Sequence, residues 1–421
     1  MTNGTRWAVG LAIALATASP AAAQQTVRLP AKDAVLTDRP TDVYTVGTVE
    51  GRDWEMFSDI RALGFDRNDN LYVLDGQNFR VVVLDARGRF VRQFGKQGGG
   101  PGELQAPLSL DVAPDGTVVV SDIGNRAFIL FTPAGEYIRN VPFADELGFP
   151  IGGVVADASG GVISRSTPRL RPDQPPTENA RFSTILRQSL DGPDAQVTPL
   201  YRVPMTPPRV LDAGGSGGQR RVTAIRMDPV FGARPTFGAL RDGLAVHHET
   251  EYGIRILDAN GRHVRTLARD FEPRKVTKKD QEEWQKRREQ EEANGGGPRT
   301  VIMSRSDGAS PSVSIGRGGN RGPGTETLRM TLENTPFAEY MSVVTSIRTD
   351  PQGRIWVQRR HADGSAAGPI DLLMPDGRYI GTLAPQPLPN AVSASGLAAW
   401  ILTDELGVEK VAVRRLPSSW R

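Results

Sequence analysis

The sequence predicts an all-β fold, a six-bladed β-propeller made of four-stranded antiparallel blades. Two observations support this prediction. A block of short apolar runs separated by Gly-containing turns recurs along the chain, and 46 glycines and 32 prolines among 421 residues favour tight turns over long helices. Because one such sheet cannot bury both faces alone, the copies must stack, and a ring of blades does this while leaving only short edges.

The repeated block is clearest near the N-terminal end of the chain. The copy at Gly64–Arg92 is followed by a gapless second copy that aligns Asp75 with Asp122 and Gly88 with Gly135. Asp-Gly, Asn-Gly and Gly-rich turns separate β-branched runs, which is the pattern of antiparallel hairpins. Six copies give six blades, which we place at residues 57–100, 105–145, 150–203, 236–272, 341–384 and 395–417.

The last copy lacks an outer strand before the chain ends. The apolar runs at Thr26–Leu29 and Val43–Val49 are expected to supply that strand, so that residues 26–49 close the ring. Residues 24–421 then form a single propeller domain. A sandwich of two sheets is the alternative, and the gapless repeats argue against it.

One stretch of the chain resembles a known repeat. Phe94–Leu104, with its Gly-Gly-Gly-Pro-Gly run, and Asp115–Asn125 are similar to an NHL repeat. The whole chain resembles the secreted bacterial six-bladed propeller proteins that carry such repeats. This resemblance is specific for fold and informs little about function, because one fold hosts many functions.

The first residues have the features of a targeting segment. Arg6 precedes the small and apolar run Trp7–Ala18, and small residues lead to Ala23. We predict a signal peptide at residues 1–23, cleavage near Ala23 and a periplasmic or secreted mature protein without a membrane span. The absence of cysteine excludes disulfides, thiolate nucleophiles and Cys-ligated zinc.

Large insertions favour one face of the ring. When the strands of a blade are named A to D from the channel outwards, the A–B and C–D turns share one face, and the B–C and D–A loops share the other. The turns of the first face are minimal, whereas the long insertions fall on the second, which we take as the working face. The longest insertion, 273–340, is expected to hold a charged helix at Lys278–Ala293 anchored by Trp284, and mobile chain at Gly296–Arg329.

Charged residues recur at equivalent B–C positions around the ring. We expect a polar rim that binds a ligand on this face, with candidate residues Asp75, Arg80, Asp122, Arg126, His248, Arg359 and Asp404. The alternative is that these side chains satisfy the backbone donors of their own loops, as a carboxylate or amide at a turn usually does.

The favoured function is a binding module for a protein, peptide or polysaccharide. The alternative is a metal-assisted hydrolase or lyase at the channel mouth, because the propeller lactonases and the peptidylglycine lyase that the fold resembles hold a divalent metal there. The four histidines do not have zinc-site spacing, so no metal ligands and no cofactor are predicted, although oxygen-ligated calcium or another divalent cation stays open. Balanced charge, 51 Lys+Arg against 48 Asp+Glu, disfavours nucleic acid. The chain is expected to be a monomer.

Overall fold

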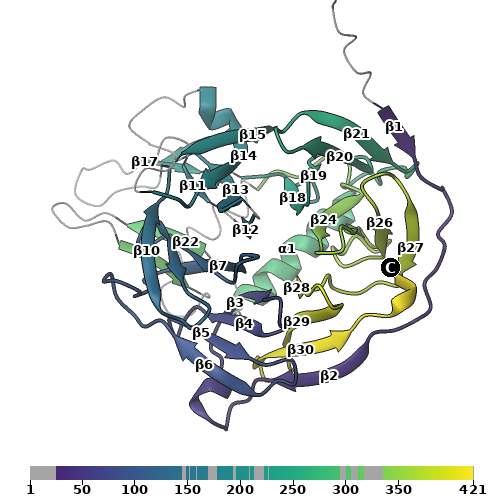
Figure 1. The fold of residues 1–421 in the computed structure, drawn as a ribbon. Helices are drawn as coiled ribbons and strands as arrows, with labels where there is room; N and C mark the ends of the chain where they lie inside the picture. Colours follow the sequence, from purple (N-terminus) through teal and green to yellow (C-terminus); the bar gives the residue numbers. More distant parts are fainter. Residues whose placement is uncertain are drawn as a thin grey trace, which may run out of the picture.

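The computed structural model describes residues 25–144, 148–150, 152–157, 159–168, 178–192, 196–207, 209–212, 222–225, 227–293, 300–304, 312–316 and 335–420. The predicted signal peptide therefore lies outside the described residues. Six sheets stand side by side around a central channel, and they confirm the six-bladed propeller (Figure 1). Within the described ranges, no helix is long and apolar enough to cross a membrane.

In blades one to five, antiparallel strands run from the channel outwards in chain order, and blade six takes its outermost strand from the N-terminal part of the chain. Blade one consists of β3 (Ile60–Phe65), β4 (Leu71–Asp75), β5 (Arg80–Leu84) and β6 (Phe90–Phe94). Blade two consists of β7 (Pro107–Val112), β8 (Val118–Asp122), β9 (Ala127–Phe131) and β10 (Tyr137–Pro142). Blade three consists of β12 (Val155–Ala156), β13 (Gly161–Thr167), β14 (Phe182–Ser189) and β15 (Val197–Pro204), with β11 (Phe149–Pro150) also paired to β13.

The other three blades follow the same plan. Blade four consists of β18 (Thr236–Leu240), β19 (Gly243–His247), β20 (Gly253–Asp258) and β21 (His263–Ala268). Blade five consists of β24 (Val344–Thr349), β25 (Ile355–Arg359), β26 (Ile370–Leu373) and β27 (Tyr379–Leu383). Blade six has β28 (Ala391–Val392), β29 (Leu397–Thr403) and β30 (Glu409–Arg415) from the C-terminal part of the chain.

A repeated turn chemistry shapes the short turns. In the A–B turn of blade one, Asp66 Oδ1 accepts hydrogen bonds from the backbone N–H groups of Asn68 (2.8 Å) and Asn70 (2.9 Å). Asp258 Oδ1 does the same in the C–D turn of blade four, for Asn260 and Arg262, both at 2.9 Å. Gly261 completes that turn with φ of 76°, and a β-carbon there would lie 1.9 Å from the Leu200 carbonyl oxygen. These turns form locally, so the sequence could predict them.

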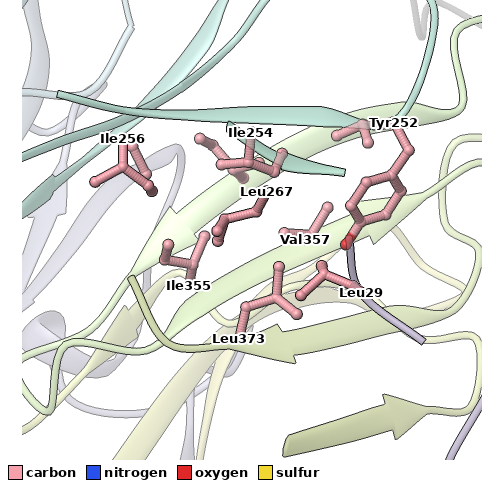
Figure 2. Packing of buried hydrophobic residues seen from close by; sticks show 11 residues of the cluster. Leu29, Tyr252, Ile254, Ile256, Leu267, Ile355, Val357 and Leu373 are labelled. Atoms are coloured by element: carbon pink, nitrogen blue, oxygen red, sulfur yellow. The ribbon is translucent and has the colours of Figure 1, made fainter. Parts of the chain in front are cut away.

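The hydrophobic core lies between neighbouring blades. The five residues of β4 and the five of β8 are all buried, because a B strand is covered by a blade on each side. Figure 2 shows the cluster between blades four and five, where Ile254 and Leu267 face Ile355, Val357 and Leu373. The same packing repeats between the other blades, so the ring is held by apolar contact between sheets.

An N-terminal strap, defined here as residues 25–46, closes the ring. Its second strand, β2 (Thr41–Val46), pairs antiparallel with β30 as the outer strand of blade six, as the sequence analysis expected. Its first strand, β1 (Gln25–Arg28), pairs in parallel with β21 as a fifth strand of blade four, which was not expected. Between them, Leu36 N–H donates to the Thr382 carbonyl of blade five at 2.9 Å. The strap thus runs along three blades (Figure 1, purple).

The long insertion begins with the predicted helix. Helix α1 spans Lys278–Ala293, as expected from its cap and composition. Thr277 Oγ1 accepts from the Asp280 N–H (3.3 Å) while the Asp280 carboxylate accepts from the Thr277 N–H (2.8 Å), which is a reciprocal cap. The ring of Trp284 meets that of Phe337 edge-on, with centroids 5.6 Å apart. In Figure 1, α1 projects onto the opening of the ring.

Two hairpins occupy the insertions. Strands β22 (Thr300–Ser304) and β23 (Ser312–Gly316) pair as a hairpin within the stretch for which the sequence analysis predicted mobile chain. The short run Thr300–Ser304 and its partner contain β-branched residues that the surrounding Gly, Ser and Arg composition obscured. A second hairpin, β16 (Arg209–Asp212) with β17 (Val222–Ile225), lies in the connection between blades three and four.

Candidate binding cavity

A cavity of about 1310 Å³ occupies the central channel. Residues of the innermost strands of all six blades line it, together with the A–B turns and the C–D turns of blades four and five. Among the turn residues are Arg67, Pro114, Asp242, Gln352 and Asp376. The cavity therefore reaches the face with short turns, whereas the sequence analysis placed the working mouth on the face with long loops.

The opposite end of the channel is built differently. On blades four and five, only the last residues of the inner strands, Ala239–Leu240 and Arg348–Thr349, line the cavity. The segments that lead into these strands pair with each other, since the Val230 N–H donates to the Pro336 carbonyl (2.8 Å) and the Val230 carbonyl accepts from the Ala338 N–H (3.0 Å). The insertions thus add chain to the face of the B–C and D–A loops, whereas the cavity is lined by residues near the A–B and C–D turns.

Two charged residues line the cavity on inner strands of opposite blades. Asp111 is the last but one residue of β7 in blade two, and Arg348 is the last but one residue of β24 in blade five. Their ladder partners, Val119 and Trp356, confirm that both lie at the same level of their blades. Blades two and five are three positions apart in a ring of six, so the two residues belong to opposite walls (Figure 1).

Asp111 is a carboxyl group that is buried against the neighbouring blade. Its Oδ2 accepts a hydrogen bond from the Ala156 N–H at 2.8 Å, which ties the inner strand of blade two to that of blade three. Burial raises the pKa of Asp111 to about 6, although hydrogen bonds from the Ala156 and Val112 N–H groups act in the other direction. The carboxyl group therefore changes charge just below neutral pH.

We expect Asp111→Asn to stabilise the protein at pH 8 but not at pH 4. A carboxyl group whose pKa rises from 3.8 to about 6 on folding costs stability as the pH increases through that window. Above a pH of about 6 the full loss of stability, about 2 kcal/mol for this half-buried group, is present. Urea unfolding of the variant and of an exposed control, Asp242→Asn, at the two pH values measures this difference. Equal stabilisation by Asp111→Asn at both pH values would contradict the assignment.

Arg348 is the cationic counterpart. Its Nη1 donates to the Asn390 carbonyl at 3.0 Å, which leaves further N–H donors of the guanidinium group for the cavity. Burial by the surrounding walls lowers the pKa of Arg348 from its ordinary value, yet the side chain is accessible to solvent inside the channel. Within the described ranges, no carboxylate pairs with this arginine.

Two further charged residues of the cavity wall are held in ion pairs. Asp157 lines the cavity and binds the Arg187 guanidinium group. Burial raises the pKa of Asp157, but hydrogen bonds from Arg187, Ser159 and Gly161 outweigh it and lower the value to about 2. Arg61 similarly pairs with Asp59. Arg348 and Asp111 have no ion pair among the described residues, and they lie on the inner strands, whereas Arg241 and Asp242 lie in an exposed A–B turn at the mouth.

The predicted polar rim is not an open ring of charges. Asp75 is fully buried and accepts from Asn78 Nδ2 (2.8 Å) and from Arg80 Nε (3.2 Å), and Asp122 is fully buried and accepts from the Gln105 N–H at 2.8 Å. A carboxylate at the end of a B strand satisfies the donors of adjacent loops, which was the alternative that the sequence analysis kept open. These two acids therefore cannot form the exposed rim.

Arg126, His248 and Asp404 sit in three separate local networks. Arg126 has φ of 56° and places its guanidinium 5.6 Å from the centroid of the Phe149 ring. His248 Nε2 lies 3.1 Å from the Tyr201 hydroxyl, and burial together with the Arg255 charge lowers the pKa of His248. Asp404 caps its own turn and pairs with Lys410 Nζ at 3.0 Å.

Arg359 belongs to a buried ion network instead of the rim. Its Nη2 lies 2.6 Å from Asp33 Oδ2 of the strap and its Nε 3.4 Å from Asp371 Oδ1. Arg269 completes the network at 2.8 Å from Asp371 Oδ2 and 3.0 Å from Asp33 Oδ1. The side chains of Arg269 and Asp371 are 0% exposed, so this cluster fastens the strap between blades four and five.

The described part of the chain brings no three His, Asp or Glu residues together as a metal site would require. His247 is buried, and its Nδ1 lies 2.9 Å from the Gly253 carbonyl oxygen. His361 pairs with Asp363 at 3.0 Å in a loop. Amide and carbonyl oxygens can also ligate a divalent cation, so the metal-assisted alternative stays a prediction.

Comparisons with known proteins agree with the fold. The family DUF5128, described as a 6-bladed beta-propeller, matches residues 50–147, which include blades one and two. A member of the duf4221 family from Bacteroides vulgatus has a solved structure with 13% identity and a TM-score of 0.50, and the alignment covers 90% of this chain and 97% of that one.

Two further solved structures are similar at lower scores. A protein of Bacteroides fragilis assigned as exported has 10% identity and a TM-score of 0.48, covering 91% of this chain and 98% of that one. A streptogramin B lyase has 11% identity and a TM-score of 0.42, covering 89% and 98%. Identities this low inform on architecture alone.

Proposed function

We propose that the protein is a binding module that takes a peptide or oligosaccharide segment into its central cavity from the A–B/C–D face. The observation that supports this most strongly is the pair Arg348 and Asp111 on opposite walls of a cavity of about 1310 Å³. Cavities for drug-sized ligands measure about 300–1,000 Å³, so this one suits an extended polymer segment.

The charges define the chemistry of the ligand. The free donors of Arg348 favour a carboxylate or another anionic group. Asp111 accepts donors when it is ionised, and favours a hydroxyl, amide or ammonium group at the other wall. Backbone, apolar side chains such as Leu108 and Val154, and charged residues of the turns supply the remaining surface. A segment with both an anionic group and hydrogen-bond donors meets all three requirements.

Entry from the turn face is the part of this proposal that departs from the sequence analysis. The short turns leave the cavity accessible there, whereas the insertions add chain to the loop face. Export from the cytoplasm remains part of the proposal, because the first 23 residues have the pattern of a signal peptide. A periplasmic or secreted module would meet peptides and polysaccharides of the cell envelope.

We expect Arg348→Met to weaken binding of anionic ligands at least tenfold, because a hydrogen bond to a charged group contributes about 1.5–3 kcal/mol. The assay is calorimetric titration with a defined panel of short acidic, neutral and basic peptides and of neutral and uronic-acid oligosaccharides. Arg28→Met, at an exposed ion pair on the outer edge of blade four, is the matched control. The proposal fails if no panel member binds the wild type, or if both variants bind acidic members equally well.

A further inference from the structure

The inner edge of blade three is interrupted inside the channel. Pro150 of β11 pairs with Ser166 of β13, and Val155 of β12 pairs with Ile163, so the inner chain advances five positions while β13 advances three. In blades one, two and five the inner strand carries one extra residue at the corresponding place, and blade three carries two. Such β-bulges are frequent next to functional sites, where they end strand pairing or redirect side chains.

The described residues of this bulge, Gly152–Val154, line the cavity. Gly152 and Gly153 are exposed, and a β-carbon on either would meet nothing within 4 Å. Within the described ranges, the N–H groups of these two glycines donate no hydrogen bond. Glycine lets a ligand approach the main chain closely, because no side chain covers it. The bulge therefore offers main-chain hydrogen-bonding groups to the cavity.

Ser109 stands beside the bulge on the neighbouring blade. It lies two residues before Asp111 on β7, so the two side chains share one face of the strand. The hydrogen bond from the Ala156 N–H to Asp111 identifies this as the face toward blade three (Figure 1). Ser109 lines the cavity but is only 5% exposed, and its hydroxyl has no hydrogen-bond partner among the described residues. A buried hydroxyl without a partner is unfavourable, so a ligand group that reaches it gains a hydrogen bond and removes this cost.

Ser121 provides an internal comparison for Ser109. It is the ladder partner of Ser109 on β8, so both hydroxyls lie on the same face of blade two. Ser121 is 1% exposed, and its hydroxyl also has no partner in the described part of the chain, but Ser121 is not among the residues that line the cavity. The two serines thus agree in chemistry and burial and differ in their access to the channel.

We propose that the bulge and Ser109 bind the main chain of an extended peptide, so that the ligand of the cavity is a peptide and not an oligosaccharide. This inference rests on the function proposed above and narrows it. An extended peptide directs the N–H and C=O groups of every second residue to the same edge, and that edge can pair with Gly152 and Gly153 as an added strand does. An oligosaccharide has no such row of donors and acceptors. Arg348 on the opposite wall favours an acidic residue in the same peptide.

Calorimetric titration with N-methylated peptides tests main-chain recognition. The acidic peptide of the panel that binds most tightly is made in two further forms, one N-methylated at every odd residue and one at every even residue. Because one edge of the peptide faces the bulge, one form should bind at least tenfold more weakly, through the loss of two or more hydrogen bonds. The other form should bind as the parent peptide does. Equal affinity of the two methylated forms would overturn the proposal.

The two serines give a matched pair of variants. Ser109→Ala should bind the parent peptide about fivefold more weakly, which is the effect of one neutral hydrogen bond. It should resist urea at least as well as the wild type, because the substitution removes a buried hydroxyl that has no partner within the described ranges. Ser121→Ala is the control and should bind the peptide as the wild type does. If the two variants bind the peptide with the same affinity, Ser109 does not contact the ligand and the proposal is wrong.

The same titrations separate this inference from the proposed function. If an oligosaccharide of the panel binds, if Gly153→Trp abolishes that binding and if no peptide binds, the cavity is a binding site and the peptide assignment is wrong. If no member of the panel binds the wild type, the proposed function fails and the inference fails with it.

Discussion

Replacing Arg269 with methionine is expected to lower the free energy of unfolding by about 3–5 kcal/mol. The substitution leaves Asp371 as a fully buried carboxylate whose remaining cationic neighbour, Arg359, is 3.4 Å away. It also removes a contact to Asp33 and a hydrogen bond at 2.9 Å to the Pro30 carbonyl, so the strap loses its attachment at the same time. Urea unfolding followed by tryptophan fluorescence measures the change.

A matched control and a double variant separate burial of charge from other causes. Arg28→Met breaks an ion pair with Asp270 whose side chains are 73% and 74% exposed, and should cost no more than about 1 kcal/mol. Adding Asp371→Leu to Arg269→Met removes the unpaired buried carboxylate and should recover part of the loss. If Arg269→Met costs no more than Arg28→Met, the ion network does not stabilise the fold.

Removing the strap is expected to have the second large effect. A chain that starts at residue 50 lacks β2, so five ladder pairs with β30 are lost and the edge of blade six is exposed. Tyr44 and Val46, which pack against the core between blades six and one, are lost as well. We expect a loss of about 5–10 kcal/mol, on the order of the whole stability of a domain, and no cooperative unfolding transition.

Addition of a synthetic peptide spanning residues 25–50 should restore the transition, because an extended segment can add a strand to an open sheet edge. The same peptide with Tyr44→Asp is the control and should not restore it, since a charge would enter the apolar contact. A truncated chain that melts cooperatively at the wild-type temperature would show that blade six does not need the strap.

Local chemistry explains which parts of the fold could be predicted. Asp66 and Asp258 close turns with residues only a few positions away, and the cap of α1 involves Thr277 and Asp280. Such patterns are complete within a short window of sequence, so blades and helix were found. The pairing of β1 with β21 joins the N-terminal segment to a strand in the middle of the chain and leaves no periodic signal.

The candidate site could be predicted less well, for a related reason. Equivalent positions around the ring suggested a rim, but Asp75 and Asp122 are buried by contacts with loops that sequence alone does not place. Asp111 could have been noticed in the sequence as the one charged residue of the inner strand Pro107–Val112. Its importance depends on Arg348, three blades away, and only closure of the ring places the two on opposite walls of one cavity.

The claim that a ligand binds in the central channel is tested most directly by a variant whose side chain fills the cavity. Gly153 lines the channel, and a β-carbon there would meet nothing within 4 Å, so Gly153→Trp can place an indole in the cavity without a clash at the backbone. Leu406→Trp adds the same side chain on the outside, at a position that is 86% exposed. Calorimetric titration with the tightest peptide or oligosaccharide of the panel should show binding to wild type and Leu406→Trp, and at least tenfold weaker binding to Gly153→Trp. Equal affinity of all three proteins would contradict a ligand site in the central channel.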